Sequence, residues 1–164
     1  MRPRILISAA SAGRVENYIE AVEAAGATAT AIYAPKLDLE YDGLLLSGGA
    51  DVDPEFYGQE NCGSTGIERE RDLAELELAR AYMAAGKPIL GAIDGEASSV
   101  IRDAECGFCC GAEDAEGLAE CVREFVRHNN IAEFSKNAIT YYAQHFSKEI
   151  FIDHLEQALS TEEK

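Results

Sequence analysis

Basic residues are scarce in this sequence. The 164-residue chain has 14 lysines and arginines against 30 aspartates and glutamates, a formal net charge of −16. Residues 1–90 carry 8 basic and 15 acidic groups and residues 91–164 carry 6 and 15, so neither half offers a basic face. Repulsion from phosphate backbones therefore argues against nucleic acid as a partner.

Long apolar runs are also missing. No stretch approaches the roughly 20 apolar residues that a membrane span needs, which argues against a membrane partner. The opening MRPRILISAASAG is interrupted too soon for a signal peptide. With 47% hydrophobic and 27% charged residues, the chain has the composition of a globular protein, and its length suits one domain over residues 1–164. We expect it to be cytoplasmic.

Cysteines are few and odd in number. The five do not fit a fully paired secreted framework. Three of them form a C-x-x-C-C cluster at Cys106, Cys109 and Cys110, but no second Cys/His pair lies at zinc-finger spacing. We expect these three to pack as small apolar residues in a strand, and we assign no metal and no cofactor. For His128, His145 and His154 we favour structural roles near or within helices.

Short apolar runs alternate with segments of helical periodicity. Glycines at the expected ends of two helices, Gly26 and Gly86, mark their termini. The pattern predicts strands at residues 4–8, 28–33, 43–46, 88–91 and 107–110. It predicts helices at residues 15–25, 71–85, 97–104, 114–127, 131–145 and 147–159.

This order of elements predicts an α/β fold. Strands that are apolar throughout are typical of parallel sheets covered on both faces. With right-handed crossovers, we expect a three-layer, doubly wound, flavodoxin- or Rossmann-like sheet with strand order 2-1-3-4-5. Two extra C-terminal helices should pack back onto it. The apolar side chains of the last one need cover on this domain or on a second copy, so a homodimer through the C-terminal helices is a further prediction; they are Phe151, Ile152, Leu155 and Leu159.

Ligands of such sheets bind beyond the carboxyl ends of the strands. The most informative loop there is LLLSGGADVDPEFYGQE, which places Gly48 and Gly49 directly after a buried strand. Two glycines let backbone N–H groups turn toward an oxyanion. They are equally typical of a tight turn that merely requires glycine, and the spacing leaves both readings open.

Residues 1 to about 80 resemble class I glutamine amidotransferase-like proteins, nearest the γ-glutamyl hydrolases that include the γ-glutamyl-γ-aminobutyrate hydrolases. The segments that carry the likeness are ILISAASAGRVENYIEAVEAAGA, YDGLLLSGGADVDPEFYGQE and RERDLAELELARA. The resemblance implies that Gly48 and Gly49 contribute to an oxyanion hole. It also implies a nucleophilic cysteine after GKPILG, where this chain has Ile93. The family's activating His and Glu have no counterpart, so we assign no catalytic residue.

Residues 82–159 resemble a different family, the C-terminal end of retaining glycosyltransferases of the GT-B fold. The likeness rests on YMAAGKPILGAIDGEASSVIRDAECGFCCGAEDAEGLAECVREF and SKNAITYYAQHFSKEIFIDHLEQAL. It implies that residues 94–98 lie against a nucleotide-sugar diphosphate. The glutamate that holds the donor ribose in that family is replaced by Ala81.

We therefore interpret the chain as a chimera, engineered or a natural fusion, of residues 1–80 and 81–164, joined within residues 78–91. Both parental sites are incomplete, and we expect a non-catalytic protein. One alternative is a γ-glutamyl hydrolase that uses another nucleophile, for which Cys62 is the candidate. The other is residual binding of a small anion, nucleotide or nucleotide sugar. Its expected ligand-binding residues are Arg14, Gly48, Gly49, Asp94, Gly95, Glu96 and Ser98.

Overall fold

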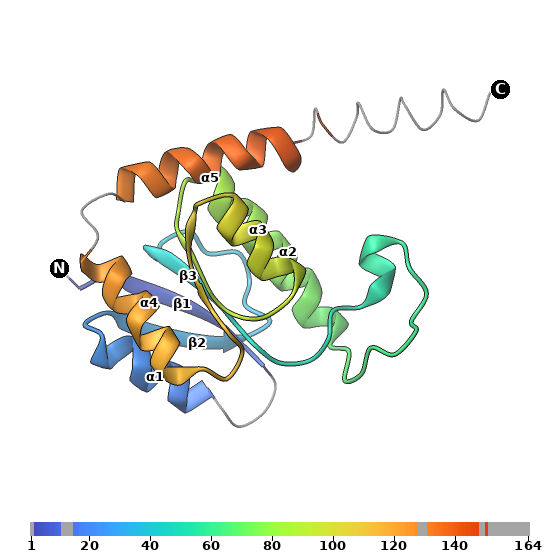
Figure 1. The fold of residues 1–164 in the computed structure, drawn as a ribbon, viewed down its shortest axis with the longest axis horizontal. Coiled ribbons are helices and arrows are strands. Elements are labelled where there is room, and N and C mark those ends of the chain that lie inside the picture. The colour runs from blue at the N-terminus through green and yellow to red at the C-terminus, as the bar shows by residue number, and fades with distance from the viewer. Residues whose placement is uncertain (1, 11–14, 128–130, 148–149, 151–164) are drawn as a thin grey trace.

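The computed structural model describes residues 2–10, 15–127, 131–147 and 150. Its centre is one parallel sheet with strand order β2-β1-β3-β4-β5 (Figure 1), which confirms the predicted topology. The strands are β1 (Arg4–Ala9), β2 (Thr28–Tyr33), β3 (Gly43–Ser47), β4 (Ile89–Ala92) and β5 (Gly107–Cys110). The chain therefore has the expected flavodoxin-like α/β fold.

Helices cover both faces of the sheet. Those described are α1 (Val15–Ala24), the short 3₁₀ helix η1 (Pro54–Tyr57), α2 (Arg69–Ala84), α3 (Glu96–Asp103), α4 (Ala115–Arg127) and α5 (Ile131–His145). Helices α1 and α4 pack together on one face, while α2, α3 and α5 contribute to the core on the other. The expected final helix, residues 147–159, lies almost wholly outside the described residues. Of this segment the structure describes Ser147 and Ile150, where the Ile150 N–H donates to Ser147 Oγ at 3.4 Å.

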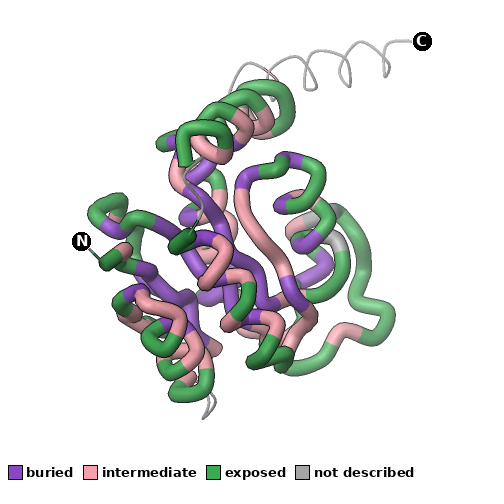
Figure 2. The backbone as a smooth tube through the Cα atoms, turned by 60° about the vertical axis from the view of Figure 1, so that its left-hand side comes forward, coloured by how far each residue is buried: buried purple, intermediate pink, exposed green. Residues whose placement is uncertain are grey.

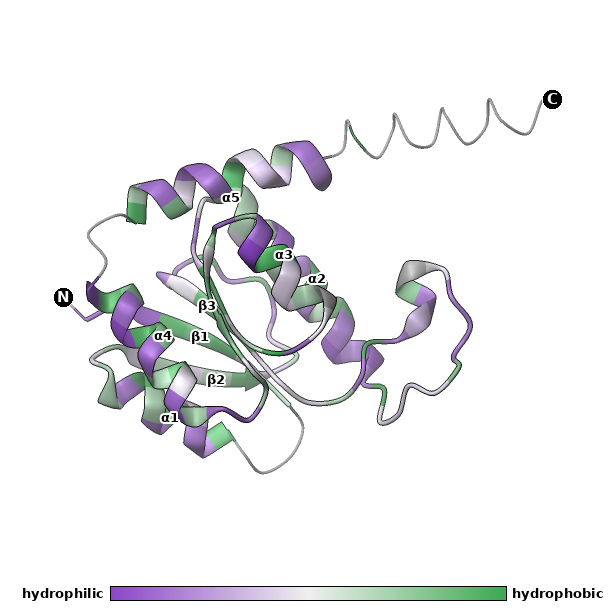
Figure 3. Cartoon of the chain, viewed as in Figure 1, coloured by the Kyte–Doolittle hydropathy of each residue, from purple (hydrophilic) through white to green (hydrophobic). Residues whose placement is uncertain are grey.

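The central strands are apolar because both of their faces are buried. Along β1, Ile5 and Ile7 point into the layer under α1 and α4, whereas Leu6 points into the layer under α2 and α3. All three are fully buried, and Figure 2 shows the sheet as the most continuously buried part of the chain. Figure 3 shows the corresponding hydrophobic strands between helices with mixed faces.

The cysteine cluster packs as predicted. Cys106 and Cys110 are buried in opposite core layers, and Cys109 packs against the layer that contains Cys106. Burial raises the pKa of the Cys106 thiol to about 12 and that of Cys109 to about 11. These thiols therefore stay protonated at neutral pH and behave as small apolar side chains.

Helix α5 packs on α2, as expected for the first of the two C-terminal helices. Its buried residue is Ala138, and its Asn137 amide donates to the Glu105 carbonyl just before β5 at 3.2 Å. The helix therefore lies toward the amino-terminal edge of the sheet. No helix in the described part of the chain is both long and apolar enough to cross a membrane.

Helix α4 should be essential to the folded domain. Phe125 is 2% exposed and belongs to the core between α1, α4 and the sheet. We expect Phe125→Ala to lower the free energy of unfolding by about 3–5 kcal/mol, the usual cost of an aromatic-to-alanine cavity, measured by urea denaturation. The matched surface control, Ile139→Ala at a 46% exposed position, should change it by less than about 0.5 kcal/mol. Equal effects would mean that α4 is not part of a single core.

Candidate functional site

A crevice opens beyond the carboxyl ends of β1 and β3. This is the topological switch point of the sheet, because the chain passes from β1 to β2 on one side and from β3 to β4 on the other. Its volume is about 510 Å³. The residues around it are mostly small: Ala9, Ala10, Val15, Tyr18, Ser47, Gly48, Gly49, Ala112 and Glu113. Glu113 is in the left-handed backbone region, with φ of 62°. This is the place where ligands bind in doubly wound folds.

The predicted ligand-binding residues divide into three groups. Gly48 and Gly49 line the crevice. Asp94 and Gly95 lie on the neighbouring turn between β4 and α3, Ser98 lies in the first turn of α3, and none of the three is among the lining residues. Arg14 lies outside the described residues, and the described lining residues include no basic side chain. Glu96 starts α3, but its side chain is not described.

The β4–α3 turn is organised by its own hydrogen bonds. Asp94 Oδ2 accepts from the Ala112 N–H at 3.3 Å. Ser98 is 3% exposed, donates to the Gly95 carbonyl at 2.8 Å and accepts from Arg102 at 3.1 Å. Gly95 has φ of 73° and precedes the helix. Because the Ser98 hydroxyl is already engaged, this turn offers a ligand fewer donors than the sequence suggested.

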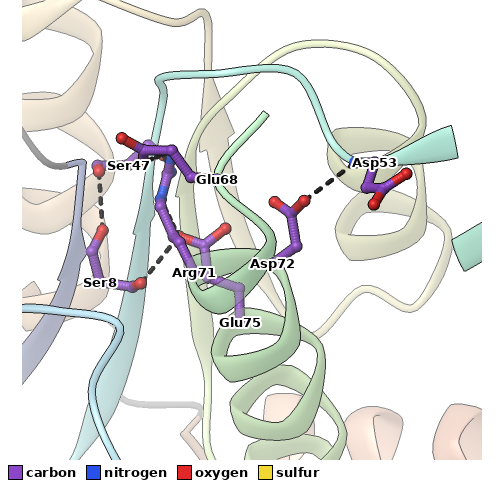
Figure 4. Close-up of polar contacts among 7 residues, drawn as sticks. All are labelled: Ser8, Ser47, Asp53, Glu68, Arg71, Asp72 and Glu75. Atoms are coloured by element: carbon purple, nitrogen blue, oxygen red, sulfur yellow. Dashed lines mark hydrogen bonds and ion pairs between the residues drawn. The ribbon is translucent and has the colours of Figure 1, made fainter. Parts of the chain in front are cut away.

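A buried guanidinium lies directly behind the glycine loop. Arg71, on α2, is 4% exposed. Its Nη2 donates to the Ser47 carbonyl at 2.5 Å, and its Nε donates to Glu75 Oε1 at 2.9 Å. Figure 4 shows this group between the end of β3 and the first turns of α2. Arg71 therefore fixes the loop after β3 to α2.

Two serines complete this polar cluster. Ser8 Oγ donates to the same Glu75 oxygen at 2.8 Å, and Ser47 Oγ donates to the Ser8 carbonyl at 2.7 Å. Both serines are at most 1% exposed. The cluster Ser8–Ser47–Arg71–Glu75 thus links β1, β3 and α2, which come from the three segments that carry the amidotransferase resemblance.

Close packing explains both glycines. A Cβ at Gly49 would lie 2.3 Å from Arg71 Nη1, and one at Gly48 would lie 3.1 Å from the Ala92 carbonyl oxygen. A side chain at either position would displace its neighbours. The structure therefore supplies a packing reason for Gly48-Gly49, whether or not their N–H groups bind an oxyanion.

The long loop after the glycines is attached to the start of α2. Asp72 Oδ2 accepts from the Asp53 N–H at 3.0 Å, and Asp53 in turn caps η1 by accepting from the Glu55 N–H at 3.0 Å. Arg69 forms ion pairs with Asp53 and Glu55. The motif residues Asp53, Arg69 and Asp72 therefore hold the loop that borders the crevice.

Sequence reasoning did not select Ser8, Ser47, Arg71 or Glu75 as site residues. The available signal was the run RERDLAE, where Arg71 and Asp72 occupy buried helix positions. A charged residue on a helix reads as solvent-exposed unless its partners are known, and the partners here come from distant strands.

Burial is the main influence on Glu75. It raises the pKa of this carboxyl above its ordinary value, while the positive charge of Arg71 and the hydrogen bond from Ser8 lower it. The net shift is upward. Arg71 therefore limits the cost of keeping a carboxylate in a mostly enclosed position.

The position expected for a nucleophile is part of the strand framework. The Ile93 N–H donates to the Cys110 carbonyl at 3.2 Å and extends the pairing of β4 with β5. Its half-buried side chain packs against the core layer under α2 and α3. Among described non-glycine residues, positive φ occurs at Ala34, Glu105 and Glu113, so Ile93 does not have the strained backbone of a nucleophile elbow.

Comparison with known families agrees with the placement of these motifs. The peptidase C26 family model matches residues 6–96, more than half of the chain. The chain belongs to the peptidase C26 family. The match contains the whole Ser8–Ser47–Arg71–Glu75 cluster and the Gly48-Gly49 loop. The predicted amidotransferase-like resemblance is thereby confirmed for this part of the chain.

Two curated relatives support the same assignment. A Lactococcus lactis subsp. lactis protein named "Putative glutamine amidotransferase-like protein YvdE" is 44% identical over 55 residues, 33% of this chain and 23% of the relative. A Mycobacterium tuberculosis protein named "Putative glutamine amidotransferase Rv2859c" is 34% identical over 88 residues, 48% of this chain and 29% of the relative. The chain thus spans less than a third of either relative. Both carry glutamine amidotransferase names. These comparisons do not support a glycosyltransferase origin for residues 82–159, which stays a prediction.

Removing the guanidinium should expose its role in stability. We expect Arg71→Met to lower the free energy of unfolding by about 3–5 kcal/mol at pH 7, as for other broken buried ion pairs, measured by urea denaturation. The pKa of Glu75 is raised in the folded state, and the charge of Arg71 lowers it. Without Arg71, the pKa of Glu75 in the folded protein should therefore rise further. The unfolded state loses its proton first as pH rises, so the loss of stability should grow above pH 4.5 and shrink below it.

The double variant Arg71→Met/Glu75→Gln is the matched control. It removes the nearer of the two carboxylates that pair with Arg71, Glu75 at 2.9 Å, and keeps Glu68 at 3.8 Å. It should therefore be more stable than Arg71→Met at pH 7 and should depend less on pH. A loss in Arg71→Met that is constant between pH 4 and pH 8 would contradict this account of the cluster.

Proposed function

We propose that the chain is a non-catalytic member of the peptidase C26 family. The observation that carries this proposal is Ile93, an aliphatic residue where the amidotransferase-like resemblance places a cysteine nucleophile. It continues the β4–β5 pairing and packs into the core. A hydrocarbon side chain cannot attack a carbonyl, and nucleophilic catalysis also needs an activating base.

The histidines give further support. His145 is the one histidine in the described part of the chain. It lies on α5, with its ring centroid 4.2 Å from the ring centroid of Tyr141. Helix α5 covers the amino-terminal side of the sheet, whereas the crevice lies beyond the carboxyl ends. His145 is therefore badly placed to serve as a base there.

Cys62 is a poor substitute nucleophile. It is exposed on the loop after η1 and follows Glu60 and Asn61. The Asn61 side chain accepts from the Gly63 and Ser64 N–H groups at 2.9 Å, which shapes a local turn. A reactive thiol needs a positive or proton-accepting neighbour, and this acidic turn supplies none among the contacts described.

We also propose that the two halves have different origins. The family match ends at Glu96, whereas β5, α4 and α5 follow it and complete the fold. The family match continues through β4, so a junction near the end of α2 or in β4 is supported by the sequence resemblance of residues 82–159 to glycosyltransferases alone. At that point both families have a helix followed by a GKPIL strand, so a splice would preserve their packing.

The activity prediction follows from the missing nucleophile and base. We expect no glutaminase or γ-glutamyl hydrolase turnover, measured as release of ammonia or glutamate. Oxyanion donors alone leave about 10³–10⁴-fold over water in enzymes that lack their triad, which lies below detection in an ordinary assay. Ile93→Cys should not restore turnover, because the base is still absent. Release that disappears in Cys62→Ala would overturn the proposal.

Weak ligand binding is the second candidate function, favoured by the 510 Å³ crevice beside Gly48 and Gly49. Its described lining offers backbone donors and the carboxylate of Glu113 rather than a basic side chain. At an effective dielectric constant of about 20, a carboxylate about 4 Å from a phosphate costs on the order of 4 kcal/mol. A neutral or weakly charged small molecule therefore suits the crevice better than a diphosphate.

For a nucleoside diphosphate sugar we expect a dissociation constant of about 1 mM or weaker, equivalent to no more than about 4 kcal/mol of binding free energy. An NMR titration of the full chain would measure it, with inorganic phosphate as the control for simple ion effects. Micromolar affinity with chemical-shift changes at Gly48, Gly49 and Gly95 would show that a nucleotide-sugar site is intact.

A further inference from the structure

A second hollow of about 710 Å³ lies along the outer face of α2, away from the crevice. We call it the α2 groove. Its apolar lining consists of Leu37, Phe56, Leu73, Leu76, Ala81 and Tyr142. Leu37 is 46% exposed and Leu73 is 53% exposed, so the groove presents large apolar side chains to solvent. Such a surface is typical of a site that another segment covers.

The chain itself passes the end of this groove. Tyr142, on α5, lines it, and Phe146 follows one turn later with its ring 6.0 Å from the guanidinium carbon of Arg80 on α2. Arg80 is also a groove residue. The Ser147 hydroxyl then accepts from the Ile150 N–H, as an N-cap does at the start of a helix. Phe146, which directly precedes Ser147, therefore lies beside Arg80 at one end of the groove.

The sequence beyond that cap matches the groove. Residues 151–159 read FIDHLEQAL, with apolar side chains at Phe151, Ile152, Leu155 and Leu159. At about 100° per residue these four fall on one side of a helix. A helix over residues 147–159 would be about 20 Å long at 1.5 Å per residue. The α2 stretch from Arg80 back to Leu73 spans about 10 Å on the same basis, so the segment is long enough to cover it.

We propose that residues 151–159 dock as an amphipathic helix in the α2 groove of their own chain. The occupant is the chain's own segment because it starts at the mouth of the groove, which gives it an effective concentration in the millimolar range without a second molecule. The segment carries Asp153 and Glu156, and the groove carries both Arg80 and Glu77, so the match between the two is one of apolar side chains and not of net charge. The docked helix would cover Leu37 and Leu73.

A spin label on the solvent side of the segment would test this arrangement. Gln157 lies opposite the apolar side in helical projection, so the labelled protein is the full chain with Gln157→Cys and Cys62→Ser, with single labelling checked by mass spectrometry. The measurement is the loss of amide NMR signal caused by the nitroxide. We expect losses at Leu73, Leu76 and Glu77 that recover when the nitroxide is reduced.

Two comparisons make the result decisive. The first comparison mixes ¹⁵N-enriched protein that carries no spin label with spin-labelled protein of natural isotope abundance. We expect no loss of amide signal in this mixture, because docking is within one chain. Leu73→Asp should abolish the loss, whereas Leu39→Asp, at a 38% exposed position outside the groove, should leave it unchanged. Signal loss in the mixture would assign the groove to a second copy. Absence of loss in the single-chain sample, or loss that survives Leu73→Asp, would also overturn the proposal.

Discussion

The buried guanidinium of Arg71 constrains the whole carboxyl edge of the sheet. A charge that is 4% exposed must be paired and hydrogen-bonded, because an unpaired charge is very costly in the interior. Glu75 supplies the opposite charge, the Ser47 carbonyl accepts a hydrogen bond, and Ser8 satisfies Glu75 from β1. The positions of β1, β3 and α2 are therefore coupled through one side chain. The same group fills the space that a side chain at Gly49 would occupy.

This coupling explains why sequence analysis could predict the fold better than the site. Apolar runs and helix stops are local signals, and they were sufficient to locate the five strands, while the general preference for right-handed crossovers gave their order. The strand from Gly43 is fully buried, so its hydrophobicity was unambiguous. The polar cluster depends on contacts between residues far apart, such as Ser8 with Glu75, 67 positions away. Without those contacts, Arg71 is indistinguishable from an exposed helical arginine.

The same reasoning separates the fold of a peptidase C26 protein from its chemistry. The Gly48-Gly49 loop packs closely against Arg71, Ala92 and Ala112, so its two glycines have a structural reason that is independent of catalysis. Ile93 extends β4 at its end, because its N–H donates to the Cys110 carbonyl of β5 and its side chain packs against the core. Packing alone therefore accounts for both the glycine loop and the residue at position 93, and the fold does not by itself decide the chemistry.

The C-terminal part is structurally integral even though the family match stops at Glu96. Strand β5 completes the sheet. Cys106, just before it, and Cys110, its last residue, enter opposite core layers. Helix α4 covers one layer with Leu118, Val122 and Phe125, and α5 contributes Ala138 to the other. Residues 6–96 alone would leave both layers open along β4, where Leu90 and Ile89 are fully buried in the complete chain. The elements after Glu96 are therefore needed to cover these two apolar surfaces, because a parallel sheet is stable only when both faces are covered.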